Sequence, residues 1–483
     1  MTSSEIKLLL SSAVDGRTRD LRYRQNQLLS LHQWIANHRI ALEHAIERDE
    51  HVEEHEAQFV VSMTLREVQA HYDELDLTKA LEEEYRVKNG RNNAGARSPE
   101  ALIYVIPEKF TLFYSALSTL SACIAAGSCC IIELPSDLTH SVSVARQCLS
   151  QCLDRTAFTF TTTRPPVEDL ARCLVVDQTG IQGALTGKRV LRSQPQSWAV
   201  ALVDRTANLE LAAKEILLSR RFFSGRGPYA PTCILVNEFV EQPFLHLLKK
   251  EISRSDGNDV DAVPNVAIAA PRKLPKNAGE VLLSQDRLID TEAFKLVMIN
   301  DRSKLCVHSP KSTKTLCLLP ISSHDDGIDT LNNHTDDSLL ALYVFASPPV
   351  AKYLTQFVRS TVSFVNHIPA NLLVGPAAPV GYSVSPVGRY RCEMMENPSP
   401  KFVSRVSGEV DLREVAQKGS EIGKLLHQQS LRPLKPTGQP REGDSNFFQQ
   451  GMLVGLIFLV LPVVTGSLIG TSYLTMKLYR RWR

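Results

Sequence analysis

The 483-residue sequence is poor in cysteine and lacks the spacings on which cysteine chemistry depends. Its ten cysteines include no C-x-x-C pair and no zinc-type ladder, so we expect free, buried thiols in a reducing compartment. Neither sign of charge dominates, because 54 basic residues against 52 acidic ones leave a net charge of +2. This balance gives no reason to expect a nucleic-acid partner. The hydrophobic content of 43% excludes a disordered or collagen-like chain and is enough for a sizeable core.

Local motifs of enzyme active sites are also missing. No G-x-S-x-G elbow is present, which gives a hydrolase of that type no support. The glycine-rich run Ser224-Gly225-Arg226-Gly227 contains no lysine and follows a predicted helix, so it does not match a phosphate-binding loop. His51-Val52-Glu53-Glu54-His55 matches the H-x-x-E-H zinc pattern, but its charged surroundings favour a solvated helix face. Cys148 and Cys152 are one helical turn apart. They could be paired thiols, but the favoured interpretation is that both are small core residues.

The two ends of the chain differ in their apolar content. Residues 1–20 contain only a short apolar patch broken by Lys7, which excludes a secretory signal. Residues 446–476 carry no charge, and residues 452–474 are almost entirely apolar. About 20 such residues are enough to cross a ~30 Å hydrocarbon core. The sequence therefore predicts a membrane partner through a single C-terminal span.

This arrangement predicts a tail-anchored protein whose folded body lies in the cytosol. The endoplasmic reticulum is the first membrane to consider, followed by the peroxisome and the mitochondrial outer membrane. The basic tail, residues 477–483, favours the opposite orientation under the positive-inside rule. The sequon Asn333-His334-Thr335 distinguishes the two, because it would be glycosylated only on the lumenal side.

The periodicity of apolar residues predicts an α/β fold. The length alone suggests about three domains. The first hundred residues show helical spacing. From residue 101 onwards, short apolar runs alternate with amphipathic stretches, as in Ala101–Pro107 followed by Phe113–Ala126, or Ala199–Asp204 followed by Asn208–Phe222. Such alternation predicts a parallel or mixed sheet covered by helices on both faces.

The order of several segments resembles the aldehyde dehydrogenases, and in particular their class 3 or fatty-aldehyde branch, which also carries a C-terminal membrane anchor. The matching segments, in chain order, are Cys123-Ile124-Ala125-Ala126-Gly127, Pro135-Ser136-Asp137, Leu202-Val203-Asp204-Arg205, Phe222-Phe223-Ser224-Gly225, Ala230-Pro231 and Leu340-Ala341-Leu342-Tyr343-Val344-Phe345. The resemblance covers roughly residues 20 to 400. It implies a Rossmann-like cofactor domain, an α/β catalytic-type domain and a C-terminal transmembrane helix.

The resemblance, together with the composition of the C-terminal part, divides the chain into segments. The predicted segments are N-terminal helices with a cofactor-binding-type domain over residues 1–190, a catalytic-type domain over 191–382, a return segment over 383–413, a flexible tether over 414–450, a transmembrane anchor over 451–476 and a basic tail over 477–483.

The catalytic positions of the family are substituted in this sequence. The family motif N-S-G-Q-T-C-V-A-P aligns with residues 223–231 and places Pro228 where the family has its cysteine nucleophile, although proline has no nucleophilic atom. Gln194 takes the place of the glutamate base, and Phe110 that of the asparagine that stabilises the oxyanion. Cys233 is the nearest alternative nucleophile, five residues further on.

The cofactor-binding positions of the family are substituted as well. Leu134, or Glu133, stands where the family lysine would contact the adenosine ribose, and Thr313 where a glutamate would hold the nicotinamide ribose. The stretch Asp177–Gln194 is too short for the family's G-S-T-x-V-G helix, and the closing P-F-G-G-V-G motif is replaced by Leu373–Ala378.

Together these substitutions predict an aldehyde dehydrogenase fold without catalysis. The first hypothesis is a membrane-anchored pseudoenzyme that needs no cofactor and binds a partner, as a homodimer or as a heterodimer with an active relative. The alternative is an NAD- or NADP-dependent oxidoreductase that converts hydrophobic aldehydes to carboxylic acids, using Cys233. A third interpretation is an unrelated membrane-anchored α/β protein.

Overall fold

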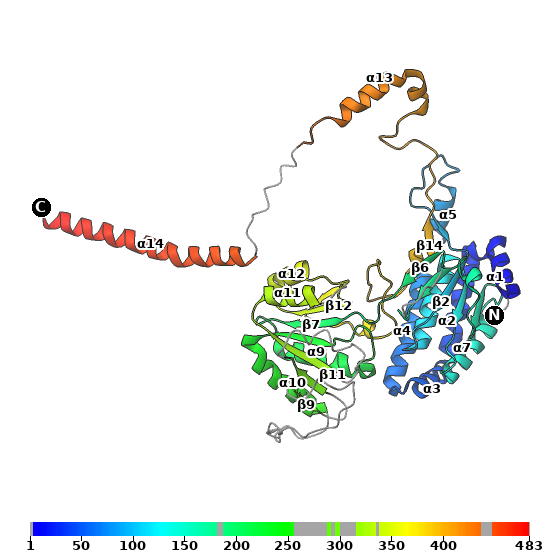
Figure 1. The fold of residues 1–483 in the computed structure, drawn as a ribbon, viewed down its shortest axis with the longest axis horizontal. Coiled ribbons are helices and arrows are strands. Elements are labelled where there is room, and N and C mark those ends of the chain that lie inside the picture. Colours follow the sequence, from blue (N-terminus) through cyan, green and yellow to red (C-terminus); the bar gives the residue numbers. More distant parts are fainter. Residues whose placement is uncertain are drawn as a thin grey trace. The chain divides into compact units, whose positions relative to one another are not determined.

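The computed structural model divides the chain into two compact units, Met1–Ser404 and Arg405–Arg483. Figure 1 follows their elements along the chain. The residues that the structure describes are 3–180, 187–255, 287–290, 295–299, 315–334, 338–435 and 447–482.

The first part of unit Met1–Ser404 is a parallel sheet with helices packed against it. The sheet order is β4 (Phe158–Thr161), β3 (Cys129–Glu133), β2 (Leu102–Ile106), β5 (Leu174–Asp177) and β6 (Arg189–Arg192). The helices of this part are α1 (Ser3–Asp15), α2 (Leu21–Asn37), α3 (Arg39–Glu50), α4 (Glu54–Asp73), α5 (Leu77–Tyr85), α6 (Leu112–Ala126), α7 (Thr139–Cys152) and α8 (Val167–Leu170). The strands start from the sheet centre and the order reverses between β2 and β5, which is the arrangement of a Rossmann-like half.

The second part of the unit contains a larger sheet. Its order is β13 (Ser363–Val365), β12 (Ala341–Phe345), β7 (Ala199–Val203), β8 (Cys233–Asn237), β11 (Thr315–Ile321), β10 (Lys295–Met298) and β9 (Arg287–Asp290), with β9 alone antiparallel to its neighbour among these strands. Its helices are α9 (Leu209–Arg221), α10 (Glu241–Ser255), α11 (His324–His334) and α12 (Pro348–Phe357). A short ribbon of β1 (Arg97–Pro99) and β14 (Glu396–Pro398) joins distant parts of the chain.

Alternate residues of each central strand face opposite helical layers. In β7, Ala199 and Ala201 pack with α9 and α10, whereas Val200 and Leu202 pack with α11 and α12. Strands buried on both faces read as continuous apolar runs, which is why the sequence pattern predicted them. The predicted α/β fold is confirmed.

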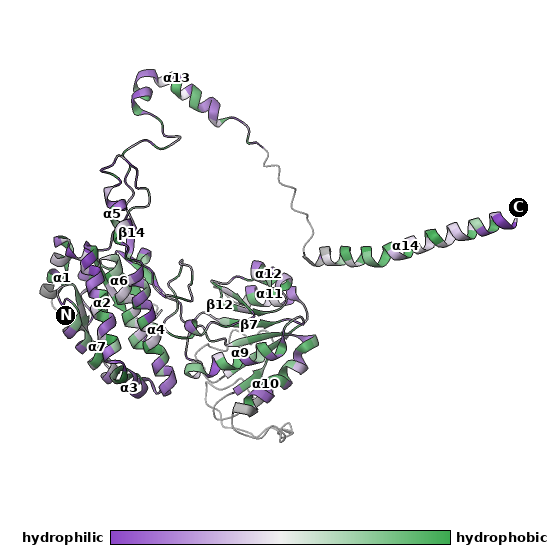
Figure 2. Cartoon of the chain, turned by 180° about the vertical axis from the view of Figure 1, so that it is seen from behind, coloured by the Kyte–Doolittle hydropathy of each residue, from purple (hydrophilic) through white to green (hydrophobic). Residues whose placement is uncertain are grey.

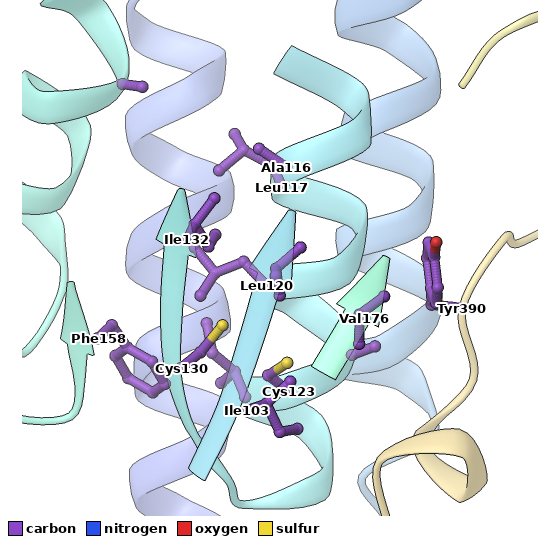
Figure 3. Close-up of a cluster of buried hydrophobic side chains, with 14 of the residues drawn as sticks. Ile103, Ala116, Leu117, Leu120, Cys123, Cys130, Ile132, Phe158, Val176 and Tyr390 are labelled. Atoms are coloured by element: carbon purple, nitrogen blue, oxygen red, sulfur yellow. The ribbon is translucent and has the colours of Figure 1, made fainter. Parts of the chain in front are cut away.

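The cysteines of the first sheet belong to its core. Figure 3 shows Cys123 of α6 and Cys130 of β3 among apolar side chains such as Ile103 and Leu120. Burial raises the pKa of the Cys130 thiol well above its usual range. Every cysteine within the described residues is a free thiol.

Helix α7 has no local cap at its start. It begins at Thr139, two residues after the segment Pro135-Ser136-Asp137, and the side chain of Leu138 before it makes no capping hydrogen bond. The carboxylate of Asp49 accepts hydrogen bonds from the backbone N–H groups of His140 (3.4 Å) and Ser141 (2.6 Å). A tertiary partner therefore satisfies the free donors of the first turn, which a local cap would otherwise have to satisfy.

The zinc-like motif does not lie on one helix. His51 ends α3 in a left-handed conformation, with φ of 51°, and α4 starts only at Glu54. Since H-x-x-E-H chemistry needs both histidines on one helix face, this break removes the geometry. Within the described ranges, no group of three or more potential ligands could hold a metal ion.

In unit Arg405–Arg483, part of the predicted tether is helical. We predicted residues 414–450 to be flexible, but α13 spans Leu412–Ser430 and is capped by Asp411, whose side chain accepts from the N–H of Arg413. This helix was not predicted from the sequence because glycines and polar residues lie between its apolar residues, which recur every three or four positions. The second helix, α14 (Phe447–Arg481), contains the predicted span: Gly451–Arg481 is long and apolar enough to cross a membrane.

Candidate functional site

The loop that follows α9 has an unusual backbone. In the 3₁₀ turn η2 (Phe222–Gly225), three consecutive residues are left-handed, with φ of 52° at Phe223, 52° at Ser224 and 66° at Gly225. Such conformations cost of order 1 kcal/mol or more for each residue that is not glycine, and they persist only where surrounding contacts impose them. They concentrate at functional sites, so this loop is the first candidate for one.

Contacts from two charged side chains hold this loop in place. The carboxylate of Glu56 on α4 accepts a hydrogen bond from the N–H of Phe223 at 2.5 Å. The guanidinium of Arg220 donates to the carbonyl of Gly225 at 3.3 Å. Phe223 itself is fully buried. The loop is thus tied to the first sheet's helices on one side and to α9 on the other.

Pro228 lies in a tight turn at the end of this loop. The N–H of Ala230 donates to the carbonyl of Gly227 at 3.0 Å, which places Pro228 at the second position of the turn, where proline is favoured. A methyl group on Gly227 would lie 2.6 Å from the carbonyl oxygen of Leu373, so the turn is packed directly against segment 373. Proline supplies neither a nucleophile nor a backbone N–H donor here.

Phe110 contacts residues of the same loop that come shortly before Pro228. Its ring contacts that of Phe223 edge to face, with centroids 5.6 Å apart. The guanidinium carbon of Arg226 lies 5.7 Å from the Phe110 ring centroid, within the range of a cation–π interaction. The Phe110 side chain is therefore engaged in aromatic and cation–π contacts, and it offers no polar hydrogen to a ligand.

Behind Phe110 lies a buried carboxylate that sequence reasoning missed. Glu50 accepts hydrogen bonds from the N–H groups of Thr111 (2.8 Å) and Leu112 (3.0 Å) at the start of α6. Burial raises the pKa of Glu50 to about 7, although these two hydrogen bonds act in the opposite direction. Thr111 is left-handed, with φ of 47°, and its hydroxyl oxygen accepts from the N–H of Gly375 at 2.9 Å.

A buried arginine completes this region. Arg389 is 3% exposed; its guanidinium carbon lies 4.8 Å from the ring centroid of Tyr229, and Nη2 donates to the carbonyl of Val374 at 2.8 Å. Nothing in the local sequence marks Arg389, because an isolated arginine in a polar stretch is typical of a surface residue.

Gln194 has a local role in the structure. Its carbonyl accepts from the N–H of Ser197 at 3.1 Å, which closes a turn between β6 and β7. The preceding residue, Ser193, donates to the carbonyl of Ala377 at 2.6 Å. The neighbouring Ser193 thus fixes residue 194 near segment 377, while Gln194 itself bonds with Ser197 inside its own turn.

Cys233 faces away from the strained loop. It begins β8 and packs with Val200, Leu235 and Cys317 in the layer of α11 and α12. Tyr229 and Ala230 pack in the opposite layer. The side chain is 2% exposed, and burial raises the pKa of its thiol well above the usual range. A buried thiol of high pKa is a weak nucleophile, since the thiolate is the reactive form.

The residues predicted for cofactor contact have other partners. Leu134 is 2% exposed and belongs to the core of the first sheet. Glu133 pairs with Arg164, whose Nε and Nη2 lie 3.1 and 3.2 Å from its two oxygens, and it also accepts from the hydroxyl of Tyr104. Thr313 lies outside the described residues.

The reversal of strand order between β2 and β5 is where an α/β sheet usually binds its ligand. Gln178 fills this place and is fully buried. Its side chain accepts from the N–H of Glu108 at 3.0 Å and donates to the carbonyl of Ser115 at 2.9 Å and to the hydroxyl of Thr119 at 2.7 Å. Only eleven residues, 178–188, join β5 to β6.

This chain resembles known aldehyde dehydrogenases in sequence and in fold. No protein-family model matches it. In sequence it is 22% identical over 382 residues to aldehyde dehydrogenase family 3 member B1 of Mus musculus, covering 72% of this chain and 79% of that protein. This confirms the resemblance to class 3 aldehyde dehydrogenases.

Solved structures share the fold. A substrate-bound AldH of Staphylococcus aureus superposes with a TM-score of 0.67 at 15% identity, covering 88% of this chain and 99% of the other. A glyceraldehyde-3-phosphate dehydrogenase of Methanocaldococcus jannaschii, complexed with NADP, gives a TM-score of 0.59 at 12% identity, covering 83% and 94%. The chain has the aldehyde dehydrogenase fold.

Proposed function

We propose that this protein, which has the aldehyde dehydrogenase fold, is a membrane-anchored pseudoenzyme that acts by binding a partner. One observation carries the proposal: Pro228 occupies the turn where the resemblance places the attacking cysteine. Proline removes the thiol, and it also removes the backbone N–H that would help an oxyanion donor at position 110. Loss of a covalent nucleophile alone costs about 10⁴ to 10⁶ in turnover.

Two further observations support the proposal that no dinucleotide is held. Leu134 is an apolar core residue, and the carboxylate of Glu133 is already paired with Arg164, so neither offers the cation that the family uses at this place. The connection of eleven residues between β5 and β6 is too short for a loop and a helix whose N-terminus would receive a pyrophosphate. The side chains at these positions do not fit NAD or NADP.

A second candidate function is NAD(P)-dependent oxidation of hydrophobic aldehydes. The similarity to aldehyde dehydrogenase family 3 member B1, over 72% of the chain, favours it. This function would require Cys233 to turn from the layer of α11 and α12 towards the strained loop, and its thiol to ionise.

Direct titration separates the two functions. We expect the full-length protein in detergent to show no saturable binding of NAD or NADP and no reduction of either with a long-chain aldehyde. A Pro228→Cys variant is expected to remain inactive, because Phe110 and Gln194 still supply neither an oxyanion donor nor a base. Saturable binding of NAD or NADP, followed by its reduction with the aldehyde, would contradict the pseudoenzyme proposal. If the Cys233→Ala variant then lost this reduction, the activity would be assigned to the Cys233 thiol.

The partner in this proposal is a second aldehyde dehydrogenase fold, either another copy of this chain or an active relative. Helix α5 supports it, because none of its residues is buried. Leu77, Leu81 and Tyr85 recur every four residues along it and are 41%, 44% and 44% exposed. Phe402 is also exposed, at 58%. Apolar side chains that share an exposed helix face are typical of an interaction surface.

We further propose that α14 anchors the body on the cytosolic side of a membrane, with the endoplasmic reticulum as the first to test. The free state of every described cysteine supports a reducing compartment. Asn333 is exposed near the end of α11. We therefore expect the protein expressed in eukaryotic cells to show no endoglycosidase-sensitive shift. A shift that Asn333→Gln abolishes would place the body in the lumen instead.

A further inference from the structure

Helix α13 presents an apolar face that the described residues of its own unit, Arg405–Arg483, leave uncovered. None of its side chains is buried. Leu412, Val415, Ile422 and Leu426 follow one another at intervals of three, seven and four residues, which places them on one side of a helix. Leu412 is 79% and Leu426 39% exposed. Figure 2 shows hydrophobic and hydrophilic residues together along α13, whereas α14 is mainly hydrophobic until its last turns.

The charges on and after α13 favour an anionic surface. Residues 412–435 contain five basic residues, Arg413, Lys418, Lys424, Arg432 and Lys435, against the two acidic residues Glu414 and Glu421. Both acidic residues lie away from the face that carries Leu426, by the angular spacing of a helix. An apolar face combined with an excess of cations is typical of helices that lie in the interface of a membrane.

The chain keeps α13 close to the membrane that α14 would cross. Sixteen residues, 431–446, separate the two helices, and at about 3.5 Å per residue they reach at most ~55 Å when fully extended. A tether of this length holds α13 at a high effective concentration near the bilayer surface. The bilayer is therefore the apolar phase that this face can reach most readily.

We propose that α13 lies in the membrane interface, with Leu412, Val415, Ile422 and Leu426 inserted among the lipids. The inference rests on the proposed anchoring by α14 and extends it. The chain would then contact the membrane at two places, α13 and α14, rather than through α14 alone. The bound ligand is a phospholipid surface that contains anionic headgroups.

Photo-crosslinking of the full-length protein tests this contact. A diazirine-bearing residue is placed at position 426 on the apolar face, at position 421 on the polar face of the same helix, or at position 459 within α14. Each protein is reconstituted into vesicles of phosphatidylcholine and phosphatidylserine and irradiated. We expect the yield of lipid adduct at 426 to exceed that at 421 by about tenfold, the ratio that the burial of one leucine-sized side chain supports. We expect strong labelling at 459.

A charged variant separates insertion from mere proximity. With the probe at 426, the double substitution Val415→Lys and Ile422→Lys is expected to abolish the lipid adduct while labelling at 459 persists. Equal labelling at 421 and 426, or crosslinks from 426 to residues of Met1–Ser404, would overturn the inference while the anchor stands. Absence of a lipid adduct at 459 would overturn the anchor itself, and with it the inference.

Discussion

Replacing Gly375 with alanine is expected to destabilise the folded body by ~3 kcal/mol or more. The φ of Gly375 is +82°, a conformation that costs an alanine about 1–2 kcal/mol. A methyl group there would also lie 2.2 Å from Cε1 of Tyr114. Tyr114 is 2% exposed on the buried helix α6, so it has no room to move aside. Overpacking of this kind adds about 1–3 kcal/mol.

Gly381 provides a matched control for backbone strain. Its φ is +85°, but nothing lies within 4 Å of the place where its methyl group would be. We therefore expect Gly381→Ala to lose only the conformational part, about 1–2 kcal/mol. Urea unfolding of both variants, followed by tryptophan fluorescence, gives the comparison. Equal losses of unfolding free energy in the two variants would show that Tyr114 does not crowd a methyl group at position 375. An insoluble Gly375→Ala protein beside a soluble Gly381→Ala protein would support such crowding.

Such crowding bears on function, because Gly375 belongs to segment 373–378, which packs against the strained loop. Gly227 has its own close neighbour in this segment, the carbonyl oxygen of Leu373, and the N–H of Gly375 is bound by Thr111. The substituted positions 110 and 228 are thus held in a tightly packed framework.

Most of the fold was predictable because its signals are local. Continuous apolar runs such as Ala101–Pro107 and Ala199–Asp204 predicted the buried strands β2 and β7, and the amphipathic stretch Asn208–Phe222 predicted α9. The start of α7 was not predictable, since its first turn is capped by Asp49 from α3. Helix α13 was missed because glycines interrupt its apolar spacing.

The sequence could point only to those residues of the candidate site that align with motifs of the resembling family. The order of the segments placed Phe110 and Pro228 in one site, and the structure brings Phe110 against the loop that ends at Pro228. Glu50 and Arg389 could not be found in this way. Each is a single charged residue in a polar stretch, which is typical of an exposed side chain. Their burial depends on contacts with segments that lie far away in the sequence, Thr111 for Glu50 and Tyr229 for Arg389.

The Glu50 carboxyl is expected to make the stability of the body depend on pH. Burial raises its pKa to about 7 in the folded state, from an ordinary value of 4.5. Above pH 4.5 the unfolded chain releases this proton, whereas the folded chain keeps it until about pH 7. The folded state therefore binds more protons in this interval, and the free energy of unfolding falls as the pH rises. Between these two pH values the free energy of unfolding falls by about 3 kcal/mol in total, and above pH 7 it falls little further.

A Glu50→Gln variant isolates this contribution, because glutamine resembles the protonated carboxyl and does not titrate. The difference in unfolding free energy between wild type and variant, measured by urea unfolding across the interval, is expected to shift in favour of the variant as the pH rises. Glu84→Gln makes the same chemical change on the exposed helix α5 and measures the effect of removing one negative charge from the protein. If the profiles of wild type and Glu50→Gln run parallel, the proton is not held at Glu50. If the difference shifts with pH as expected, the start of α6 beside Phe110 rests on a carboxyl that is neutral over much of this range, and the site loses stability when that carboxyl ionises.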